Sequence, residues 1–463
     1  MEAIDRGPSK AFLKAVAMLA VFIFLKGLLW AVTIPPLDGP DEVLHLIEAQ
    51  AASGRSVDRG VRATGIGPDV QTLADGVLVA IPPGQQPSAR FYVERVGGGE
   101  TGALEAAARQ AMAAPHTSPD TTSQQGPLTY ILYGFAVAGA WADGVIAQLY
   151  AARLVSVLLG VGACMAVVWA GRQAGLDRGF ALAAGAVVGL QPMWSQQTSV
   201  ITSDAPALFF AALTTGLVVR ANRSQRVGAA GLAGVAAIAG ILAKPELLYL
   251  VPAFFFFLLP LWGRLKSLGT GFVLLGSALL AAVVGLAILP GRLHFFSEPW
   301  SRWPAFMNAF AAQDNLQWRR LFVSFWGRFG WGELALPAGV NGTLAAVGVL
   351  VVVLWLAALL RGEPAPRSTM LGLVAIPVSA MAAVLLYDFH VWAVSAVFVG
   401  QGRYLLPALP AAVIAALAGL QGAGGLAPLR RLSQRLVPVA VVTGALALNV
   451  VGLEVVWSRL YLA

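Results

Sequence analysis

Acidic side chains and a histidine gather in one short stretch near the start of the chain, residues 33–50 (TIPPLDGPDEVLHLIEAQ). Asp41, His45 and Glu48 are spaced i, i+4 and i+7, so a helix near 41–51 would place them on one face. A carboxylate in such a position can take the proton from a hydroxyl nucleophile or hold a metal ion. Because a long apolar run directly precedes the stretch, we expect an amphipathic helix where a membrane span meets water.

Further charged side chains lie where apolar packing does not explain them. Lys244 and Arg403 are lone cations at the ends of apolar runs, an arrangement that suits an anionic ligand. Cations there can bind a phosphate that gains charge as it leaves. The candidate residues are the acids Asp41, Glu42 and Asp204, together with the binding residues His45, Lys244, Arg403, Tyr404, Arg319 and Arg320.

Each candidate also has a purely structural alternative. Asp41 and Glu42 could serve only to stabilise a helix N-terminus, an effect of roughly 0.3–1 kcal/mol each. Asp204 could be a helix N-cap, and Lys244 could be a lysine that snorkels to the membrane surface. The arginine pair at 319–320 could bind lipid head groups.

The composition is that of a membrane protein. Of the 463 residues, 58% are hydrophobic and 12% are charged, whereas soluble chains carry about 25% charged residues. Apolar stretches of about 20 residues, the length that crosses a bilayer, recur along the chain. The net charge of +8 is split among short loops between these stretches. This distribution fits the positive-inside rule and argues against a nucleic-acid partner.

Six short segments between the apolar stretches are rich in arginine and lysine. If all six are cytoplasmic, the N-terminus is cytoplasmic, about 11 transmembrane helices result, and the charged candidates fall on the external side. The basic segments are 1–14, 171–179, 220–227, 263–267, 361–368 and 421–435. The expected spans are 11–33, 147–170, 180–197, 203–219, 228–243, 246–262, 268–289, 341–360, 369–387, 404–420 and 436–457.

We therefore expect an all-α polytopic membrane protein with a single integral-membrane domain, residues 1–463. Residues 35–146 would form the first external loop, with juxtamembrane helices near 41–51 and 128–141. The second of these is too short to cross the bilayer. Residues 290–340, rich in tryptophan and arginine, would form a second large external loop.

Two predicted spans carry a cation, and a third external segment separates two others. Charge inside a membrane is expensive unless it is satisfied, so Lys26 should face the bundle or reach an interface. Arg153 should pair with a carboxylate or a backbone carbonyl rather than act chemically. Residues 388–403 would form a shorter external segment.

The order of these motifs resembles the GT-C superfamily of integral-membrane glycosyltransferases, in which a short external helix that opens with paired acids follows the first span. Residues 35–45 (PPLDGPDEVLH) are more closely similar to a bacterial predicted-membrane family with a P-D-E-P-x-H motif, although Val43 replaces its second proline. Residues 126–130 (GPLTY) resemble the proline–aromatic element of that family, but glutamine and glycine at 125–126 stand where histidine and proline are usual. Further motifs that match in type and order are SD at 203–204, AKP at 243–245 and GRYLLP at 402–407.

The resemblance implies an inverting sugar transfer from a polyprenyl-phosphate-linked donor to a glycan, lipid or protein acceptor of the cell envelope. The reaction would occur on the periplasmic face of a bacterial inner membrane, with the donor arriving through the membrane lipid. Asp41 would be the base, while Glu42 and Asp204 would orient the acceptor or, as in some relatives, help to hold a divalent metal ion. No cofactor is certain. The residues that would bind the phosphate are Lys244 and Arg403, with Arg319 or Arg320 as further candidates.

Three other functions remain open at this point. A flippase or another transporter of lipid-linked oligosaccharides would need charged residues along a path through the membrane, where only Lys26 and Arg153 are candidates. A polysaccharide polymerase or ligase would use the same class of donor with a site built from arginine and histidine. A non-catalytic assembly subunit would need none of this chemistry.

Overall fold

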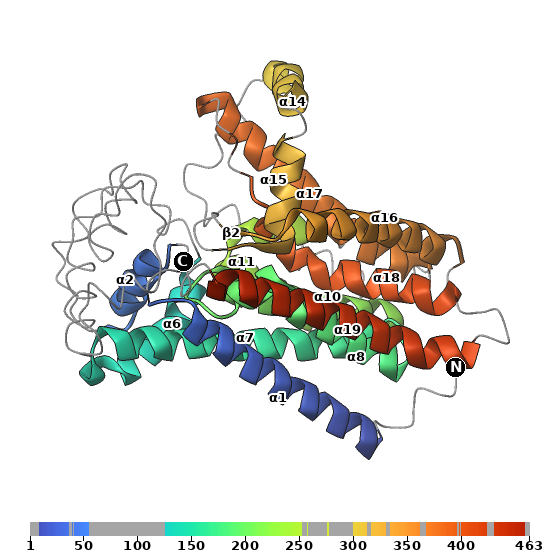
Figure 1. Ribbon diagram of the computed structural model, residues 1–463, viewed down its shortest axis with the longest axis horizontal. Helices are drawn as coiled ribbons and strands as arrows, with labels where there is room; N and C mark the ends of the chain where they lie inside the picture. Colours follow the sequence, from blue (N-terminus) through green and yellow to red (C-terminus); the bar gives the residue numbers. More distant parts are fainter. Residues whose placement is uncertain are drawn as a thin grey trace.

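The computed structural model describes residues 9–36, 39, 41–54, 126–251, 257, 276, 300–312, 316–329, 334–361, 367–395, 398, 400–423 and 430–458. Nearly all of these residues are helical (Figure 1). The first half contains α1 (Lys10–Thr33), α2 (Glu42–Ala52), α6 (Pro127–Gly139), η3 (Trp141–Asp143), α7 (Val145–Gln173), α8 (Arg178–Leu190), α9 (Pro192–Gln197), α10 (Asp204–Ser224), α11 (Val227–Ala243) and η4 (Pro245–Tyr249).

The second half adds more helices and one short antiparallel hairpin, in which Arg328 pairs with Ala335 and Phe329 with Leu334. Its elements are η7 (Trp300–Arg302), α14 (Trp303–Ala312), α15 (Leu316–Gly327), β1 (Arg328–Phe329), β2 (Leu334–Ala335), α16 (Ala338–Arg361), α17 (Arg367–Ser395), η8 (Gly402–Ala408), α18 (Leu409–Ala423) and α19 (Arg430–Trp457).

Helices long and apolar enough to cross a membrane recur through the described ranges. Seven meet both criteria: Lys10–Thr33, Val145–Gln173, Asp204–Ser224, Ala338–Ala357, Arg367–Ala393, Gly402–Gly422 and Gln434–Trp457. The shorter apolar helices α8 and α11 coincide with two more of the predicted spans. Residues 268–289 and most of 246–262 lie outside the described residues, so the total of eleven stays a prediction.

The juxtamembrane helices predicted near 41–51 and 128–141 are present as α2 and α6. Helix α6 has 13 residues, or about 20 Å of helix, which is shorter than a hydrocarbon core of about 30 Å. It packs against α2, α7 and α11. Its position at a membrane interface remains a prediction.

Four of the basic segments meet at one end of the bundle. Arg178 donates to Ser9 Oγ (2.9 Å), and Arg223 donates to the carbonyl of Gln173 (2.8 Å). The amide N–H of Asp177 donates to the side chain of Gln421 (2.8 Å). Helix α10 begins at the opposite end and is 21 residues long, so about 30 Å separates the two ends. Figure 1 shows α2 at the end opposite the N-terminus of α1.

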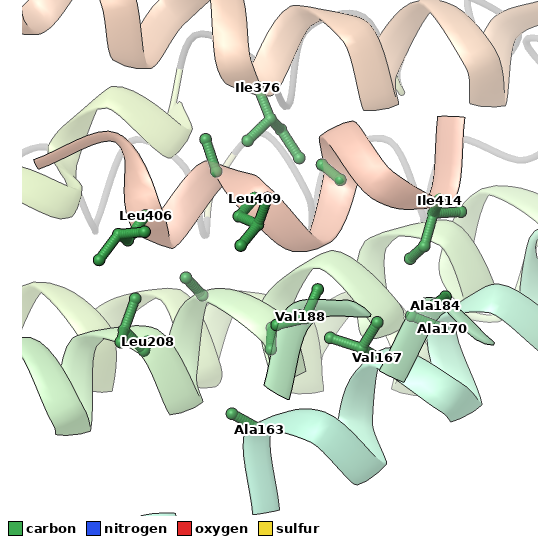
Figure 2. Close-up of a cluster of buried hydrophobic side chains, with 14 of the residues drawn as sticks. Ala163, Val167, Ala170, Ala184, Val188, Leu208, Ile376, Leu406, Leu409 and Ile414 are labelled. Atoms are coloured by element: carbon green, nitrogen blue, oxygen red, sulfur yellow. The ribbon is translucent and has the colours of Figure 1, made fainter. Parts of the chain in front are cut away.

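A continuous apolar core joins the helices of the bundle. Figure 2 shows Val188 of α8 and Leu208 of α10 on one side, and Leu406 and Leu409 on the other. Each of these side chains is at most 6% exposed. The core therefore holds η8, the short helix that carries Arg403, against α10.

The predicted span 180–197 is interrupted in the structure. Helix α8 ends at Leu190, and α9 begins with Pro192, whose ring cannot continue the hydrogen-bond ladder of the preceding helix. The break leaves carbonyls without helical partners inside the bundle, where water does not supply them. Lys26 Nζ donates to the Gly189 carbonyl (2.8 Å), and Asn449 donates to the Leu190 carbonyl (2.8 Å). Lys26 thus faces the bundle, one of the two positions predicted for it.

Helix α17 runs beyond the carboxyl end predicted for span 369–387. Helix α17 continues to Ser395, because residues 388–395 find partners that a free loop would not have. The ring of Phe389 lies 5.4 Å from that of Phe306 on α14, and Trp392 lies 5.8 Å from the same ring. A second, aromatic core therefore stabilises this extension.

Replacing Asn449 by leucine should destabilise the protein by about 1–3 kcal/mol, because the Leu190 carbonyl and the Trp30 indole N–H would lose a buried partner. The thermal unfolding midpoint in detergent micelles would report the change. Asn308→Leu on the exposed side of α14 is the matched control and should shift the midpoint little. Equal shifts for the two variants would contradict this explanation of the helix break.

Candidate functional site

His45 of α2 marks the centre of the candidate site. Its imidazole is buried, with 4% of the residue exposed. The carboxylates of Asp41 and Asp204 and the cations of Lys244 and Arg403 all lie close enough to act on its protonation. Residues from α2, α10, the end of α11 and η8 therefore converge at the end of the bundle away from the basic segments.

Asp204 and Lys244 form a buried ion pair within this site. Asp204 Oδ1 lies 2.5 Å from Lys244 Nζ, and the side chains are 5% and 7% exposed. The N-cap of α10 is Ser203, so Asp204 is the first residue of that helix and not its cap. Lys244 follows the last residue of α11 and points inward. The N-cap and snorkelling alternatives are therefore not what the structure shows.

Arg403 and Tyr404 enter the site from η8. The Tyr404 ring centre lies 5.3 Å from Lys244 Nζ and 5.6 Å from Arg403 Cζ, so both cations lie over an aromatic face. In the described part of the chain, the buried Nε of Arg403 has no hydrogen-bond partner. The preceding glycine lets η8 approach α15, since a Cβ atom at Gly402 would lie 1.9 Å from the Leu321 carbonyl oxygen.

Asp41 precedes α2 in a backbone conformation that few residues adopt. Its φ is 58° and its ψ is 13°, in the left-handed region, where aspartate and asparagine are enriched among residues other than glycine. The residue stands at the N-cap, yet within the described residues its side chain makes no cap hydrogen bond to α2. Its carboxylate is partly exposed and interacts electrostatically with His45 and Arg403.

We expected Asp41, His45 and Glu48 on one face of an amphipathic helix, and the structure differs in two respects. Asp41 lies outside the helix, and α2 is buried on most of its sides rather than on one. The side chains of Leu46 and Ala49 pack inward together with that of His45. The cause is α6, which covers the side of α2 that we expected to face water.

Glu42 turns away from the other candidates and pairs with Arg153 of α7. Its Oε2 lies 2.6 Å from Nη2 of Arg153, and both side chains are fully buried. The same carboxylate accepts from the amide N–H of Ile201 (3.1 Å) and of Gly39 (3.3 Å). Arg153 also donates to the carbonyl of Ile34 (2.7 Å). The prediction that Arg153 pairs with a carboxylate and backbone carbonyls is confirmed, and Glu42 has no oxygen left for a ligand.

Helix α6 closes the site from the side of α2. Tyr130 places its hydroxyl 3.1 Å from Nδ1 of His45. The Gly126 N–H donates to the Ala243 carbonyl (3.2 Å), and the Thr129 hydroxyl donates to the same oxygen (2.9 Å). A Cβ atom at Gly126 would lie 1.9 Å from the carbonyl oxygen of Leu242. The glycine at this position thus allows α6 to start directly against the end of α11.

Two predicted binding residues lie on α15. Arg319 is exposed, and Arg320 donates to the carbonyl of Phe398 (2.8 Å). Their place on α15 leaves the lipid head groups considered above as their alternative ligand.

Sequence reasoning also missed residues that support the site. Tyr130 belongs to the proline–aromatic motif at 126–130, but nothing in that motif indicated that its hydroxyl would lie against His45. Thr202 holds Asp204, whose N–H donates to the threonine hydroxyl (3.2 Å). The polar run at 195–203, set between two apolar stretches, could have indicated that this segment lines something other than lipid.

The environment of His45 keeps its imidazole neutral. Burial lowers the pKa of His45 to about 4, and the carboxylates of Asp41 and Asp204 oppose this effect only in part. The cations of Lys244 and Arg403 lower the pKa further. Near pH 7 one ring nitrogen can therefore accept a hydrogen bond while the other donates one.

The acids of the site do not form a set that fits a divalent metal ion. The described residues contain no group of three or more His, Cys, Asp or Glu side chains that could hold one. Asp204 faces Lys244 and Glu42 faces Arg153, so cations of the chain itself occupy both carboxylates.

The fold and the site together define a multi-pass, all-α membrane protein with a cluster of opposite charges at one end of its bundle. The chain belongs to the family described as "Predicted membrane protein (DUF2142)", whose pattern matches residues 24–412. No curated protein matches the sequence.

Several solved structures are similar at low identity. The oligosaccharyltransferase AglB from Archaeoglobus fulgidus, in complex with an inhibitory peptide and a dolichol-phosphate, is 14% identical, with a TM-score of 0.49 over 94% of this chain and 55% of that chain. ArnT from Cupriavidus metallidurans, bound to undecaprenyl phosphate, is 17% identical, with a TM-score of 0.45 over 96% of this chain and 77% of that one. This chain spans about half the length of the oligosaccharyltransferases that it matches.

Glu42→Gln should lower stability by about 3–5 kcal/mol, because it leaves the charge of Arg153 buried without its counter-ion. Asp143→Asn, an exposed acid just before α7, serves as the matched control, with little change expected. Thermal unfolding of the purified protein would measure both. A Glu42→Gln variant as stable as the control would remove the assigned structural role of this pair.

Acid should destabilise the folded protein through His45. The unfolded chain binds a proton near the ordinary pKa of 6.5, whereas the folded chain does not until about pH 4. This contribution to stability is therefore complete above pH 6.5 and is lost as the pH falls toward 4, by at most about 1.4 kcal/mol per pH unit. Unfolding midpoints measured from pH 4 to 8 should fall less steeply in His45→Gln than in the wild type. Parallel curves would argue against a neutral, buried His45.

Proposed function

We propose that this protein is a glycosyltransferase that takes a sugar from a polyprenyl-phosphate-linked donor. The observation that carries the proposal is the convergence of Lys244, Arg403 and two acids around His45 at one end of a membrane bundle. A phosphate on a lipid tail can reach such a site from the bilayer while its head group meets the cations. The acceptor would be a glycan, a lipid or a protein of the cell envelope.

Lys244 and Arg403 would bind the phosphate of the donor. When the bond between the sugar and the phosphate breaks, the bonding electrons leave with the phosphate, whose charge grows by one. Fixed cations stabilise that charge more in the transition state than in the ground state. Arg403 keeps a buried N–H donor without a partner among the described residues, so it can bind a phosphate oxygen without breaking an existing hydrogen bond at that atom.

Asp204 and Tyr404 would position these cations. The Asp204 carboxylate holds Lys244 Nζ at 2.5 Å and fixes the direction of the ammonium group. The Tyr404 ring lies between the two cations and restricts both side chains. We therefore assign Asp204 a positioning role in place of the predicted direct role in acceptor binding.

Asp41 would be the general base. Its carboxylate would take the proton of the acceptor hydroxyl as the hydroxyl oxygen attacks the anomeric carbon from the face opposite the phosphate, which inverts that carbon. Helix capping does not occupy the carboxylate within the described residues. The left-handed backbone fixes its direction, a type of strain that clusters at functional sites.

Glu42 would act only by holding the backbone of the neighbouring Asp41. The ion pair with Arg153 fixes the start of α2 against α7 and against the loop that precedes Asp204. This assignment replaces the predicted contact of Glu42 with acceptor or metal.

The orientation in the membrane is part of the proposal. The basic segments that meet at the far end of the bundle would face the cytoplasm by the positive-inside rule. The N-terminus would then be cytoplasmic and the site periplasmic, in the inner membrane of a bacterium.

The competing transport function receives less support from the same contacts. A transport path needs charges that a moving substrate can meet. Lys26 and Arg153, the two cations inside the first spans, are each held by fixed partners. A polymerase or ligase built from arginine and histidine would leave the carboxylate of Asp41 without a task.

Asp41→Asn should reduce sugar transfer by about a hundredfold or more, because an amide cannot accept the proton of the acceptor. The full chain in liposomes would be given polyprenyl-phosphate sugars and cell-envelope glycan, and radiolabelled product would be measured. Asparagine suits the left-handed backbone as well as aspartate does, so the variant should unfold at the wild-type temperature. Asp143→Asn, an exposed acid before α7, is the matched control and should transfer normally.

Two outcomes would count against parts of this proposal. If Asp41→Asn transfers as fast as the wild type, another residue is the base. If the wild type transfers no sugar from a broad donor panel but moves lipid-linked sugar across the bilayer, the protein is a flippase.

A further inference from the structure

Helix α9 carries an unusual group of buried polar side chains. Gln196 is 1% exposed and Gln197 is fully buried. In the part of the chain that the structure describes, Gln196 Oε1 and both amide atoms of Gln197 have no hydrogen-bond partner, and the same holds for Nε1 of Trp194. Leaving a buried polar group of this kind without a hydrogen bond destabilises the folded chain. Their concentration on six residues is what a site for a polar ligand would leave in the unliganded chain.

The side chains on the other side of α9 have hydrogen-bond or packing partners in neighbouring helices. Ser195 contacts Lys26 of α1 and Asn449 of α19 through hydrogen bonds of 2.9 and 2.7 Å. Thr198, which follows the helix, packs directly on Gly160 of α7. A Cβ atom added at Gly160 would lie only 2.7 Å from the Cβ of Thr198. Successive residues turn by about 100° around a helix, so Gln196 and Gln197 lie on the face opposite Ser195 and Thr198.

Besides the elements that Ser195 and Thr198 contact, α15, β1 and η8 pack against α9. Gln191, just before α9, donates to the Phe325 carbonyl and so fixes this helix to α15. The Gly402 N–H donates to Ser324 Oγ (2.6 Å), which fixes η8 to the same helix. The next residue on η8 is Arg403, whose Nε also lacks a partner among the described residues. Unsatisfied donors and acceptors thus occur on two packed elements, one of which bears a proposed phosphate ligand.

A sugar supplies the groups that would satisfy this set. Each hydroxyl both donates and accepts, and a carboxamide can bind two neighbouring hydroxyls through its oxygen and its nitrogen. We infer that Gln196 and Gln197 bind the hydroxyl groups of the donor's sugar while Arg403 holds its phosphate. This inference rests on the proposed function and adds to it the part of the protein that selects the sugar.

The test separates recognition of the sugar from recognition of the phosphate. Binding of undecaprenyl phosphate and of a panel of undecaprenyl-phosphate hexoses to the full chain in detergent would be measured by ligand-dependent thermal stabilisation. The wild type should bind its preferred hexose-linked lipid at least about tenfold more tightly than the bare lipid, a difference of about 1.4 kcal/mol. Gln196→Leu and Gln197→Leu should remove that preference and leave affinity for the bare lipid within about twofold.

A matched glutamine controls for packing. Gln148 is also buried, but its amide has partners in Gln50 (2.7 Å) and the Trp141 carbonyl (3.4 Å). Gln148→Leu should therefore lower stability and keep the sugar preference, whereas Gln197→Leu should not lower stability because no hydrogen bond is lost. If a leucine variant does not fold, Gln196→Asn and Gln197→Asn keep the polar group, displace it by one methylene, and should still weaken the preference.

The outcomes distinguish the two proposals. A wild type that binds neither lipid overturns the proposed function and this inference with it. A wild type that prefers the sugar-linked lipid, with the preference unchanged in the glutamine variants, overturns the inference alone and assigns the unpaired amides to buried water. Arg403→Gln should weaken binding of both lipids, which would confirm that the probes occupy the proposed phosphate site.

Discussion

The structure around the site depends on the buried ion pair of Glu42 and Arg153. Helix α1 ends where two prolines follow, and Arg153 donates to the carbonyls that this end leaves free. Glu42 receives the arginine on one side and the N–H of Ile201 on the other. One pair therefore joins α1, α2, α7 and the loop before Asp204. Because both charges are desolvated, each is tolerated only with the other in place.

Buried carbonyls at a second place in the bundle also receive hydrogen bonds from side chains of other helices. An interruption between α8 and α9 frees carbonyls in an apolar interior, and Lys26 and Asn449 each supply donors to them. The proline that causes the interruption begins α9, whose buried polar residues lie on a helix that packs against η8. Lys26, a cation inside a span, thus has a structural role in the interior of the bundle. Lys244 and Arg403, at the end of the bundle, are the cations to which we assign ligand binding.

Much of this arrangement could be predicted from the sequence. The parts that could not be predicted share one cause. Hydropathy located seven of the expected spans, because apolar length alone decides them. Paired acids after a first span, and lone cations at the ends of others, indicated Asp41, Asp204, Lys244 and Arg403. The roles of Glu42, Arg320 and Tyr130 depend on which neighbour lies opposite, as does the length of α17. Helical spacing cannot predict these roles, because spacing describes residues within one helix. The roles of these residues depend on contacts between two elements.

The close approach of Gly126 to α11 bears on what holds α2 and α6 in place. Helix α6 is fixed at its first turn by the end of α11, and α2 is fixed by its packing on α6 and by the ion pair with Arg153 of α7. Contacts among the described residues therefore anchor both of the elements that border residues 55–125.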